Sequence, residues 1–344
     1  MSDRIPVTVL TGYLGAGKTT LLNRILAEDH GRRYAVIVNE FGEIGIDGEL
    51  IVSADEELFE MNNGCICCTV RGDLIRTLRG LLARRGGFDA IVVETTGLAD
   101  PGPVVLTFFV DAVLQEATVL DSVTTLVDAR HVGRRLDDSR EAVEQVAFAD
   151  QIILNKIDLV SDEELRAVEA RLLRLNPQAP VYRARRADVA LDTILGRGGF
   201  DLGRIAVRVP AAANPPHGAP GHVHDDGCGA AGDAHRHDHD IGSVALVSDR
   251  PMDADRVGAW LEELLAAKGQ DILRAKGIVA AAGEDRRLVF QAVHMVLDGD
   301  WQRPWRPGER RQSRIVFIGR DLDAAALRAG FDACAAVPAA SPVA

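Results

Sequence analysis

Short runs of apolar, often β-branched residues alternate with amphipathic stretches through the first 200 residues of the chain. The runs that read as buried strands are IPVTVL (5–10), YAVIVN (34–39), FDAIVVET (88–95), residues 118–127, QIILN (151–155) and PVYRA (180–184). Helical spacing is found in three stretches between them: Leu21, Leu22, Ile25 and Leu26; Leu74, Leu78, Leu81 and Leu82; and residues 162–174. Because strands and helices alternate, the pattern predicts an α/β domain over residues 1–200, with a doubly wound, mostly parallel sheet.

The pattern changes abruptly at residues 201–241. This segment is rich in Pro, Gly, Ala, His and Asp and has no apolar periodicity, so we expect a flexible linker. Beyond it, residues 242–336 predict a smaller α+β domain with an antiparallel sheet. Its expected elements are a strand at 241–248, a helix that begins after Asp253, strands at 276–281, 288–296 and 314–319, and a helix over 321–335. Residues 337–344 are expected to be a disordered tail.

Length and composition agree with a two-domain globular protein, at 344 residues of which 47% are hydrophobic and 26% charged. No apolar run reaches the roughly 18 residues that a membrane span requires, and the first residues lack a signal-peptide layout, so we expect a cytoplasmic protein without a membrane partner. The net charge of −12 argues against binding to nucleic acid, whose phosphates favour a basic surface. The five cysteines do not suggest a disulfide framework, because their number is odd and three of them are clustered.

The segment GYLGAGKT (12–19) follows a predicted strand and precedes a predicted helix, which is the context that a phosphate-binding P-loop requires. Its glycines let backbone N–H groups curl around phosphate oxygens, and the helix directs its positive end at the anion. Lys18 is expected to reach the β- and γ-phosphates, and the Thr19 hydroxyl to bind Mg²⁺. The expected nucleotide contacts of this segment are Gly12, Gly15, Ala16, Gly17, Lys18, Thr19 and Thr20. We therefore expect the first domain to have a P-loop NTPase fold.

The tetrapeptide NKID (155–158) follows an apolar strand and indicates which base is bound. The Asp158 carboxylate can accept hydrogen bonds from guanine N1–H and from the exocyclic amine, whereas adenine offers neither donor. Asn155 would anchor the base-binding loop, and Lys156 would lie over the ring. The combination favours GTP over ATP.

An acidic residue near the end of a buried strand completes the pattern of a GTPase. Glu94 lies near the end of the run at 88–95, and Gly97 follows three residues later. Glu94 would hold Mg²⁺ through a water or orient the attacking water, and the Gly97 N–H would sense the γ-phosphate. We therefore assign catalysis to Lys18, Thr19, Glu94 and Gly97. A glutamate that only caps the strand is the alternative.

Three of the cysteines, Cys65, Cys67 and Cys68, fall within the short segment GCICC. Neighbouring cysteines form only strained disulfides, whereas thiolates on a glycine-bounded turn can converge on one soft ion such as Zn²⁺. Glu40 or Glu43 of the segment NEFGEIG, a water or a partner ligand would complete the coordination. Packing as small buried hydrophobes and a thiol redox switch remain alternatives.

The expected linker holds six of the nine histidines of the chain. They are His217, His222, His224, His235, His237 and His239. Neutral imidazoles bind Zn, Ni, Co and Cu, so we expect an auxiliary metal collector of low specificity, with a merely solvated polar linker as the alternative. The isolated His30, His131 and His294 are interpreted as structural.

Taken in order, the segments TGYLGAGKTTLLNRIL, NEFGEIGID, NNGCICC, ETTGLADPGPV and NKID resemble the CobW family of P-loop GTPases, relatives of UreG and HypB. The segments RAKGIV, LVFQAVH, DWQRPW and RIVFIGRDLD resemble the second domain of that family, so the resemblance extends over nearly the whole chain. It implies a GTP-dependent metallochaperone or metal-insertion factor that delivers a metal ion to a client metalloprotein. It also implies that Cys65, Cys67 and Cys68 bind this metal, with Glu40 and Glu43 nearby.

These inferences combine into one hypothesis for the mechanism. The segment from Glu40 to Cys68 lies between the P-loop and Glu94, where switch loops respond to the γ-phosphate. GTP would order this segment so that its cysteines bind Zn²⁺, or else Co²⁺, and hydrolysis to GDP would release the ion to the client. Turnover is expected to be slow, because no arginine finger is identifiable. We expect a monomer or homodimer. Two alternatives remain: a metal-storage or sensing protein with a regulatory GTP site, and a P-loop ATPase or kinase.

Overall fold

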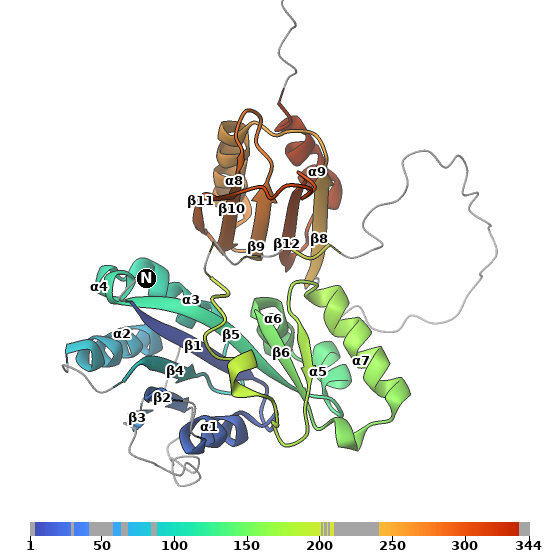
Figure 1. The fold of residues 1–344 in the computed structure, drawn as a ribbon. Coiled ribbons are helices and arrows are strands. Elements are labelled where there is room, and N and C mark those ends of the chain that lie inside the picture. Colours follow the sequence, from blue (N-terminus) through green and yellow to red (C-terminus); the bar gives the residue numbers. More distant parts are fainter. Residues whose placement is uncertain are drawn as a thin grey trace, which may run out of the picture.

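The computed structural model describes residues 4–28, 31–40, 58–62, 68–83, 88–200, 202, 205, 207–209 and 241–336. Within that part, the chain forms a larger N-terminal domain and a smaller C-terminal domain that lies over it (Figure 1). None of the described helices has both the length and the apolar character that crossing a membrane requires.

A seven-stranded parallel sheet forms the centre of the N-terminal domain, with strand order β3-β2-β4-β1-β5-β6-β7. The strands are β1 (Ile5–Gly12), β2 (Tyr34–Glu40), β3 (Leu58–Asn62), β4 (Ala90–Glu94), β5 (Thr118–Asp128), β6 (Gln151–Asn155) and β7 (Val181–Arg183). The helices are α1 (Lys18–Ala27), α2 (Cys68–Ala83), α3 (Gly102–Val110), α4 (Ala112–Ala117), α5 (Val132–Asp138), α6 (Arg140–Phe148) and α7 (Asp162–Leu175). The doubly wound α/β architecture predicted from the sequence is confirmed.

Alternate residues of the central strands face two different hydrophobic clusters, which explains why these strands read as continuous apolar runs. In β2, Ala35 and Ile37 belong to the cluster on one face, whereas Val36 and Val38 belong to the cluster on the other. Helix α1 covers the second face, and helices α2, α3, α6 and α7 cover the first. The sheet is therefore buried on both faces, and the carboxyl ends of its strands are where functional residues can reach a ligand.

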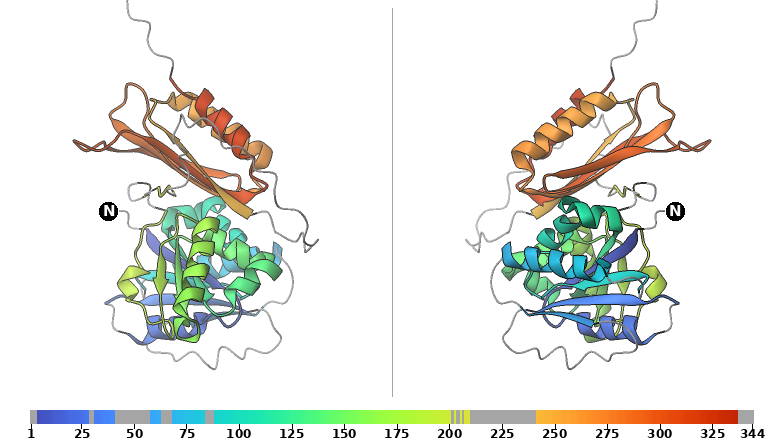
Figure 2. Two further views of the ribbon diagram at one scale, coloured as in Figure 1. Left: turned by 90° about the vertical axis from the view of Figure 1, so that its right-hand side faces the viewer. Right: turned by 90° about the vertical axis from the view of Figure 1, so that its left-hand side faces the viewer.

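The C-terminal domain is a five-stranded antiparallel sheet with helices on one face, which confirms the expected α+β arrangement. In the strand order β11-β10-β9-β12-β8 its strands are β8 (Ile241–Ser248), β9 (Ile272–Val279), β10 (Arg286–Val293), β11 (Val296–Pro304) and β12 (Ser313–Arg320). The helices α8 (Ala254–Lys268) and α9 (Ala324–Ala333) pack on the side turned away from the N-terminal domain, around Phe317 and Phe331 (Figure 2).

The contact between the two domains combines apolar packing with a buried charge cluster. Leu273 and Val316, on the sheet face opposite to α8 and α9, belong to the same hydrophobic cluster as the core of the N-terminal domain. Beside them, Lys276 Nζ lies 2.9 Å from Asp150 Oδ1, and Arg274 pairs with the same oxygen. We call Asp150, Arg274 and Lys276 the interdomain charge cluster. It places two cations and one carboxylate out of water.

The stability of the protein is expected to rise between about pH 8 and pH 10.5 relative to a Lys276→Met variant. Burial lowers the pKa of Lys276 from 10.5 to about 8, and the neighbouring Arg274 guanidinium acts in the same direction. In that window the unfolded chain retains the lysine proton that the folded protein has lost, so raising the pH removes a cost of folding. Urea unfolding of both proteins at about pH 7.5 and about pH 9.5 measures the effect. An unfolding free-energy difference that is the same at both pH values would contradict it.

One expectation for the strands of the C-terminal domain is wrong. Residues 288–296 do not form one strand, because the chain turns at His294, whose φ is 49°, and returns as β11. The sequence pattern did not predict β11, since this edge strand has few buried residues and many polar ones. The last helix, expected over roughly 321–335, is present and spans Ala324–Ala333.

Some of the described residues just beyond residue 200, near which the first domain is expected to end, are packed in the hydrophobic cluster that the two domains share. Ile205 and Val207 are buried in the hydrophobic cluster, and the Arg208 N–H donates to Gln178 Oε1 at 3.0 Å. Residues 205, 207 and 208, which belong to the segment expected to be the linker, are therefore packed against the rest of the chain.

Candidate functional site

The phosphate-binding segment lies between β1 and α1, at the carboxyl edge of the sheet. Gly12, Gly15 and Gly17 have φ values of 141°, 74° and 109°, which residues other than glycine rarely adopt. A Cβ atom on Gly12 would lie 2.3 Å from the Leu126 carbonyl oxygen, so only glycine fits there. Lys18 Nζ donates to the Gly12 carbonyl oxygen at 2.8 Å and folds the loop over the start of α1. A glycine-rich turn at a helix N-terminus suits a bound phosphate.

Asn155, at the end of β6, joins the phosphate-binding segment to the segment expected to hold the base. Its Nδ2 donates to the Ala16 carbonyl oxygen at 2.9 Å, and its Oδ1 accepts from the Ala187 N–H at 2.8 Å. Arg186 and Ala187 have positive φ values of 50° and 56°, which non-glycine residues seldom adopt. One buried side chain therefore fixes both loops at the same edge of the sheet.

Lys156 and Asp158 follow directly on this anchor. Lys156 has a φ of 60°, and its Nζ lies 2.8 Å from Asp128 Oδ2 at the end of β5. Asp158 lies in the short 3-10 turn Ile157–Leu159 and is exposed. An exposed carboxylate beside a fixed lysine can accept hydrogen bonds from the edge of a purine base.

β4 brings Glu94 next to the phosphate-binding segment. β4 pairs with β1, and Glu94 is in register with Leu10. The following residue fastens the two strand ends together: the Thr95 N–H donates to the Leu10 carbonyl oxygen at 2.9 Å, and its hydroxyl donates to the Thr11 hydroxyl at 2.8 Å. Glu94 itself is only 6% exposed.

The loop after β4 lies against the phosphate-binding segment. A Cβ atom on Gly97 would lie 2.6 Å from the Leu14 side chain and 2.7 Å from the Leu14 nitrogen, so a larger residue would displace one of the two loops. The Thr96 hydroxyl is buried and has no hydrogen-bond partner within the part of the chain that the structure describes. A buried hydroxyl in this position is costly unless a ligand satisfies it, which makes it a candidate contact for a cation, a water or a phosphate.

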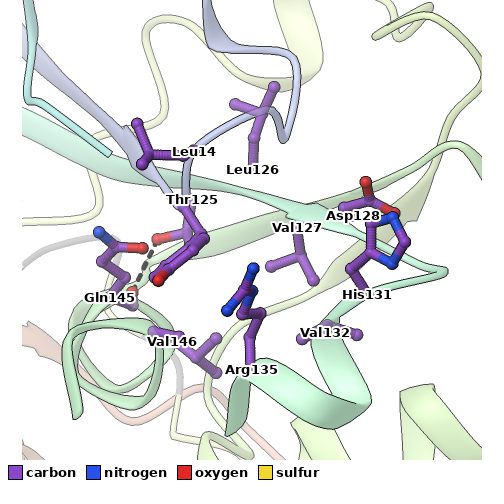
Figure 3. Close-up of a pocket in the computed structure, with 12 residues that line it drawn as sticks. Leu14, Thr125, Leu126, Val127, Asp128, His131, Val132, Arg135, Gln145 and Val146 are labelled. Carbon is purple, nitrogen blue, oxygen red and sulfur yellow. Dashed lines mark hydrogen bonds between the residues drawn. The ribbon is translucent and has the colours of Figure 1, made fainter. Parts of the chain in front are cut away.

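A cavity of about 60 Å³ lies between the phosphate-binding segment, β5, α5 and α6, and Figure 3 shows the residues that line it. Arg135 and Gln145 belong to its walls. The Arg135 guanidinium carbon lies 4.8 Å from the ring centre of Tyr13, the second residue of the phosphate-binding segment. Arg135 of α5 and Gln145 of α6 therefore line the same cavity as the phosphate-binding segment.

Three polar residues of this region were missed by sequence reasoning. They are Asp128, Arg135 and Gln145. Asp128 could have been found as a carboxylate at the end of an apolar run, in the same way as Glu94. The two helical residues have no comparable signal, because their helices lack a motif and their contacts are made by tertiary packing.

The expected transition-metal ligands lie largely outside the described residues. Those outside are Glu43, Cys65, Cys67, His217, His222, His224, His235, His237 and His239. For Glu40 and Cys68 only the backbone is described: Glu40 ends β2, and Cys68 begins α2. Val38 of β2 is in register with Glu94, so the chain leaves the sheet at the same edge at which Glu94 lies. Among the described residues, no group of three or more His, Cys, Asp or Glu side chains could hold a metal ion.

Comparison with known proteins finds families that match both domains of this chain. Residues 6–183 match the family described as CobW/HypB/UreG, nucleotide-binding domain, and residues 241–335 match the cobalamin synthesis protein cobW C-terminal domain. The chain is 39% identical over 331 residues to the zinc chaperone YjiA of Escherichia coli (strain K12), which covers 95% of this chain and 98% of that protein. It is 43% identical over 187 residues to the zinc-regulated GTPase metalloprotein activator 1 of Schizosaccharomyces pombe, covering 52% of this chain and 45% of that protein.

The similarity extends to the three-dimensional structure. The crystal structure of Zn(II)-bound YjiA GTPase from E. coli matches with a TM-score of 0.75 at 33% identity, covering 97% of this chain and 99% of that chain. Both domains take part in the match. The resemblance noted from the sequence motifs is thereby confirmed, and the chain belongs to the CobW family.

Proposed function

We propose that the chain is a GTPase that binds a transition-metal ion, zinc in the first place, and delivers it to a client protein in the cytoplasm under the control of the bound nucleotide. The observation that carries the proposal is the double hydrogen bond of Asn155, the first residue of NKID, which joins the phosphate-binding segment at Ala16 and the loop after β7 at Ala187. The names of two relatives, zinc chaperone and zinc-regulated GTPase metalloprotein activator, support both the metal and the reaction.

The nucleotide would lie along the carboxyl edge of the sheet. Lys18 and the backbone N–H groups of the phosphate-binding segment would hold the β- and γ-phosphates. Asp158 would accept hydrogen bonds from guanine, and Lys156, fixed by Asp128, would lie along the base. A carboxylate in this role favours GTP because adenine offers it no N1–H or 2-amino donor.

The donors around the phosphate-binding segment fit a hard cation such as Mg²⁺. Thr19 supplies a hydroxyl near the start of α1, Glu94 is a buried carboxylate, and the Thr96 hydroxyl is buried without a partner among the described residues. When bound, Mg²⁺ neutralises charge on the phosphates. Glu94 would hold it through a water or orient the attacking water, and the Gly97 N–H would bind the γ-phosphate. Attack of water breaks the bond between the γ-phosphorus and its bridging oxygen, giving GDP and phosphate.

The delivered ion would be bound by Cys65, Cys67 and Cys68, with Glu40 or Glu43 as further ligands. Thiolates prefer soft ions, and Zn²⁺ fits them best, with Co²⁺ next. The segment between Glu40 and Cys68 leaves the sheet at the end of β2, re-enters it as β3, which pairs with β2, and ends where α2 begins. Ordering of loops by the γ-phosphate would therefore reach the cysteines, and hydrolysis would release the ion. The linker histidines would serve as an auxiliary collector.

Zn²⁺ is expected to bind about 10-fold more tightly, or more, to the protein saturated with a non-hydrolysable GTP analogue than to the GDP form. Because coupling between two sites is reciprocal, Zn²⁺ must raise the affinity for the analogue relative to the affinity for GDP by the same factor. Competition with a chromophoric chelator measures the Zn²⁺ affinity, and titration of a fluorescent analogue measures the reverse effect. A triple variant with Cys65→Ser, Cys67→Ser and Cys68→Ser should bind GTP normally but lose the nucleotide-dependent Zn²⁺ site. Equal Zn²⁺ affinity in both nucleotide states would exclude the coupling.

The same titrations separate the proposal from the two alternatives. A metal-storage or sensing protein would bind several ions in proportion to its linker histidines, and the triple variant would retain them. A P-loop ATPase or kinase would bind ATP at least as well as GTP. Delivery itself is tested by transfer of Zn²⁺ to a zinc-free acceptor, which should be faster with GTP than with its non-hydrolysable analogue.

A further inference from the structure

The loop that follows β4 is held in place by a residue of helix α6. Gln145 of α6 is 1% exposed, and its Nε2 donates to the carbonyl oxygens of Gly97 at 3.1 Å and Ala99 at 3.2 Å. The backbone carbonyl oxygen of Gln145 accepts from the Thr125 hydroxyl of β5 at 2.8 Å (Figure 3). Gln145 therefore ties the loop to the sheet on both sides of Leu98.

The residue before Gln145 in α6, Glu144, contacts the C-terminal domain. Glu144 is 4% exposed, and it pairs with Arg140 of its own helix at 2.8 Å and with Arg320 at the end of β12. Consecutive residues of a helix point about 100° apart, so α6 presents Glu144 to the C-terminal domain and Gln145 to the loop. A displacement of one contact moves the other, because every residue of α6 from 142 to 148 is buried.

The C-terminal domain also reaches the far end of the loop directly. His294, in the turn between β10 and β11, lies against Phe148 of α6 with ring centres 5.3 Å apart. A Cβ atom on Gly102, the first residue of α3, would lie 2.9 Å from His294 Nε2 and 3.1 Å from Asp100 Oδ1. The imidazole and the carboxylate therefore meet over this glycine. The loop contacts the phosphate-binding segment at Gly97 and the C-terminal domain at its other end.

We propose that Gln145 is a positioning residue for GTP hydrolysis, and that the C-terminal domain sets the hydrolysis rate through Arg320 and His294. The inference rests on the proposed function, in which the loop begins at Glu94 and carries Gly97 to the γ-phosphate. A partner that binds the C-terminal domain and shifts its contact with α6 would change turnover without touching the nucleotide. The interdomain contact would then report client binding to the GTPase site.

The test compares kcat for GTP and Kd for GDP in the full-length protein, in three test variants and in one control variant. Gln145→Met keeps the length of the side chain but loses its donors, and it is expected to lower kcat about 10-fold or more while changing Kd for GDP less than about 2-fold. Arg320→Gln and His294→Gln lie away from the nucleotide and are expected to lower kcat about 5-fold with KM unchanged. Arg310→Gln, which removes an exposed ion pair to Asp249 in the same domain, is the matched control and should keep the wild-type kcat.

Unfolded material is corrected for by counting the sites that bind a fluorescent GDP analogue in each preparation. The inference is overturned if Arg320→Gln and His294→Gln retain the wild-type kcat per binding site. It is also overturned if kcat per site and GDP affinity fall in parallel in every variant, because a merely structural role predicts that result. A wild-type protein that binds GTP but does not hydrolyse it would reject the proposed function itself.

Discussion

An Asp158→Asn variant is expected to bind GTP on the order of 10³-fold more weakly than the wild-type protein and to bind xanthosine triphosphate instead. The carboxylate can accept hydrogen bonds from both guanine N1–H and the 2-amino group. Asparagine presents one acceptor and one NH₂ donor, so its amide would face the 2-amino group donor to donor. Xanthine has a carbonyl oxygen at that position, which the asparagine amide can bind.

We expect a large loss of GTP affinity because the turn that carries Asp158 is held by contacts of both Lys156 and Asn155. Lys156 is held at a φ of 60° with its ammonium paired to Asp128. Asn155 ties the same turn to the phosphate-binding segment through the Ala16 carbonyl oxygen. A carboxylate carried by such a turn cannot move far to accommodate a different base.

Titration of fluorescent GTP, ATP and xanthosine triphosphate analogues into both proteins measures this change. Asp162→Asn is the matched control, since Asp162 is exposed at the start of α7 and should not affect the preference for GTP. Undiminished GTP affinity in Asp158→Asn would place the base elsewhere. Equal affinity of the wild-type protein for ATP and GTP would favour the ATPase alternative.

The elements that were predictable from the sequence are those whose order of apolar and polar residues is typical of one kind of element, either a fully buried strand or an amphipathic helix. The strands of the parallel sheet are apolar on both faces, and α7 has a capping box and a polar outer face. Helix α6 was not predicted, although Arg140, Glu141, Glu144 and Gln145 recur at helical spacing; the sequence could not indicate that Glu144 and Gln145 are buried. Strand β11 was missed because it lies at an edge and is largely exposed.

The nucleotide site was predictable because backbone recognition of phosphate requires glycines and a lysine at fixed spacing. Gln145 and Arg274 could not be found in this way. Gln145 is 48 residues from Gly97, and Arg274 is 124 residues from Asp150, so each pair is brought together only by tertiary packing. Sequence periodicity carries information about which face of an element is buried but none about which polar group it meets there.

Asp150→Asn is expected to lower the free energy of unfolding by about 3–5 kcal/mol. The Asp150 side chain is 5% exposed, accepts from the Val123 N–H at 2.9 Å and pairs with Arg274 and Lys276 of the other domain. Asparagine would leave the buried Arg274 guanidinium without a counter-charge and would favour the neutral form of Lys276, whose pKa burial already lowers to about 8, so the charge pairing across the interface would be lost. Lys276→Met leaves one cation with one carboxylate and should cost no more than about 1–2 kcal/mol.

Tryptophan fluorescence separates loss of the interface from loss of the whole fold, because all three tryptophans lie in the C-terminal domain. They are Trp260, Trp301 and Trp305. In the wild-type protein, fluorescence and far-UV circular dichroism should change at the same urea concentration, whereas in Asp150→Asn the two transitions should separate. Asp249→Asn, which breaks an exposed pair with Arg310, is the control and should cost less than about 1 kcal/mol. If Asp150→Asn behaves like this control and its transitions coincide, the apolar contact alone holds the domains together, and the charge cluster contributes specificity rather than stability.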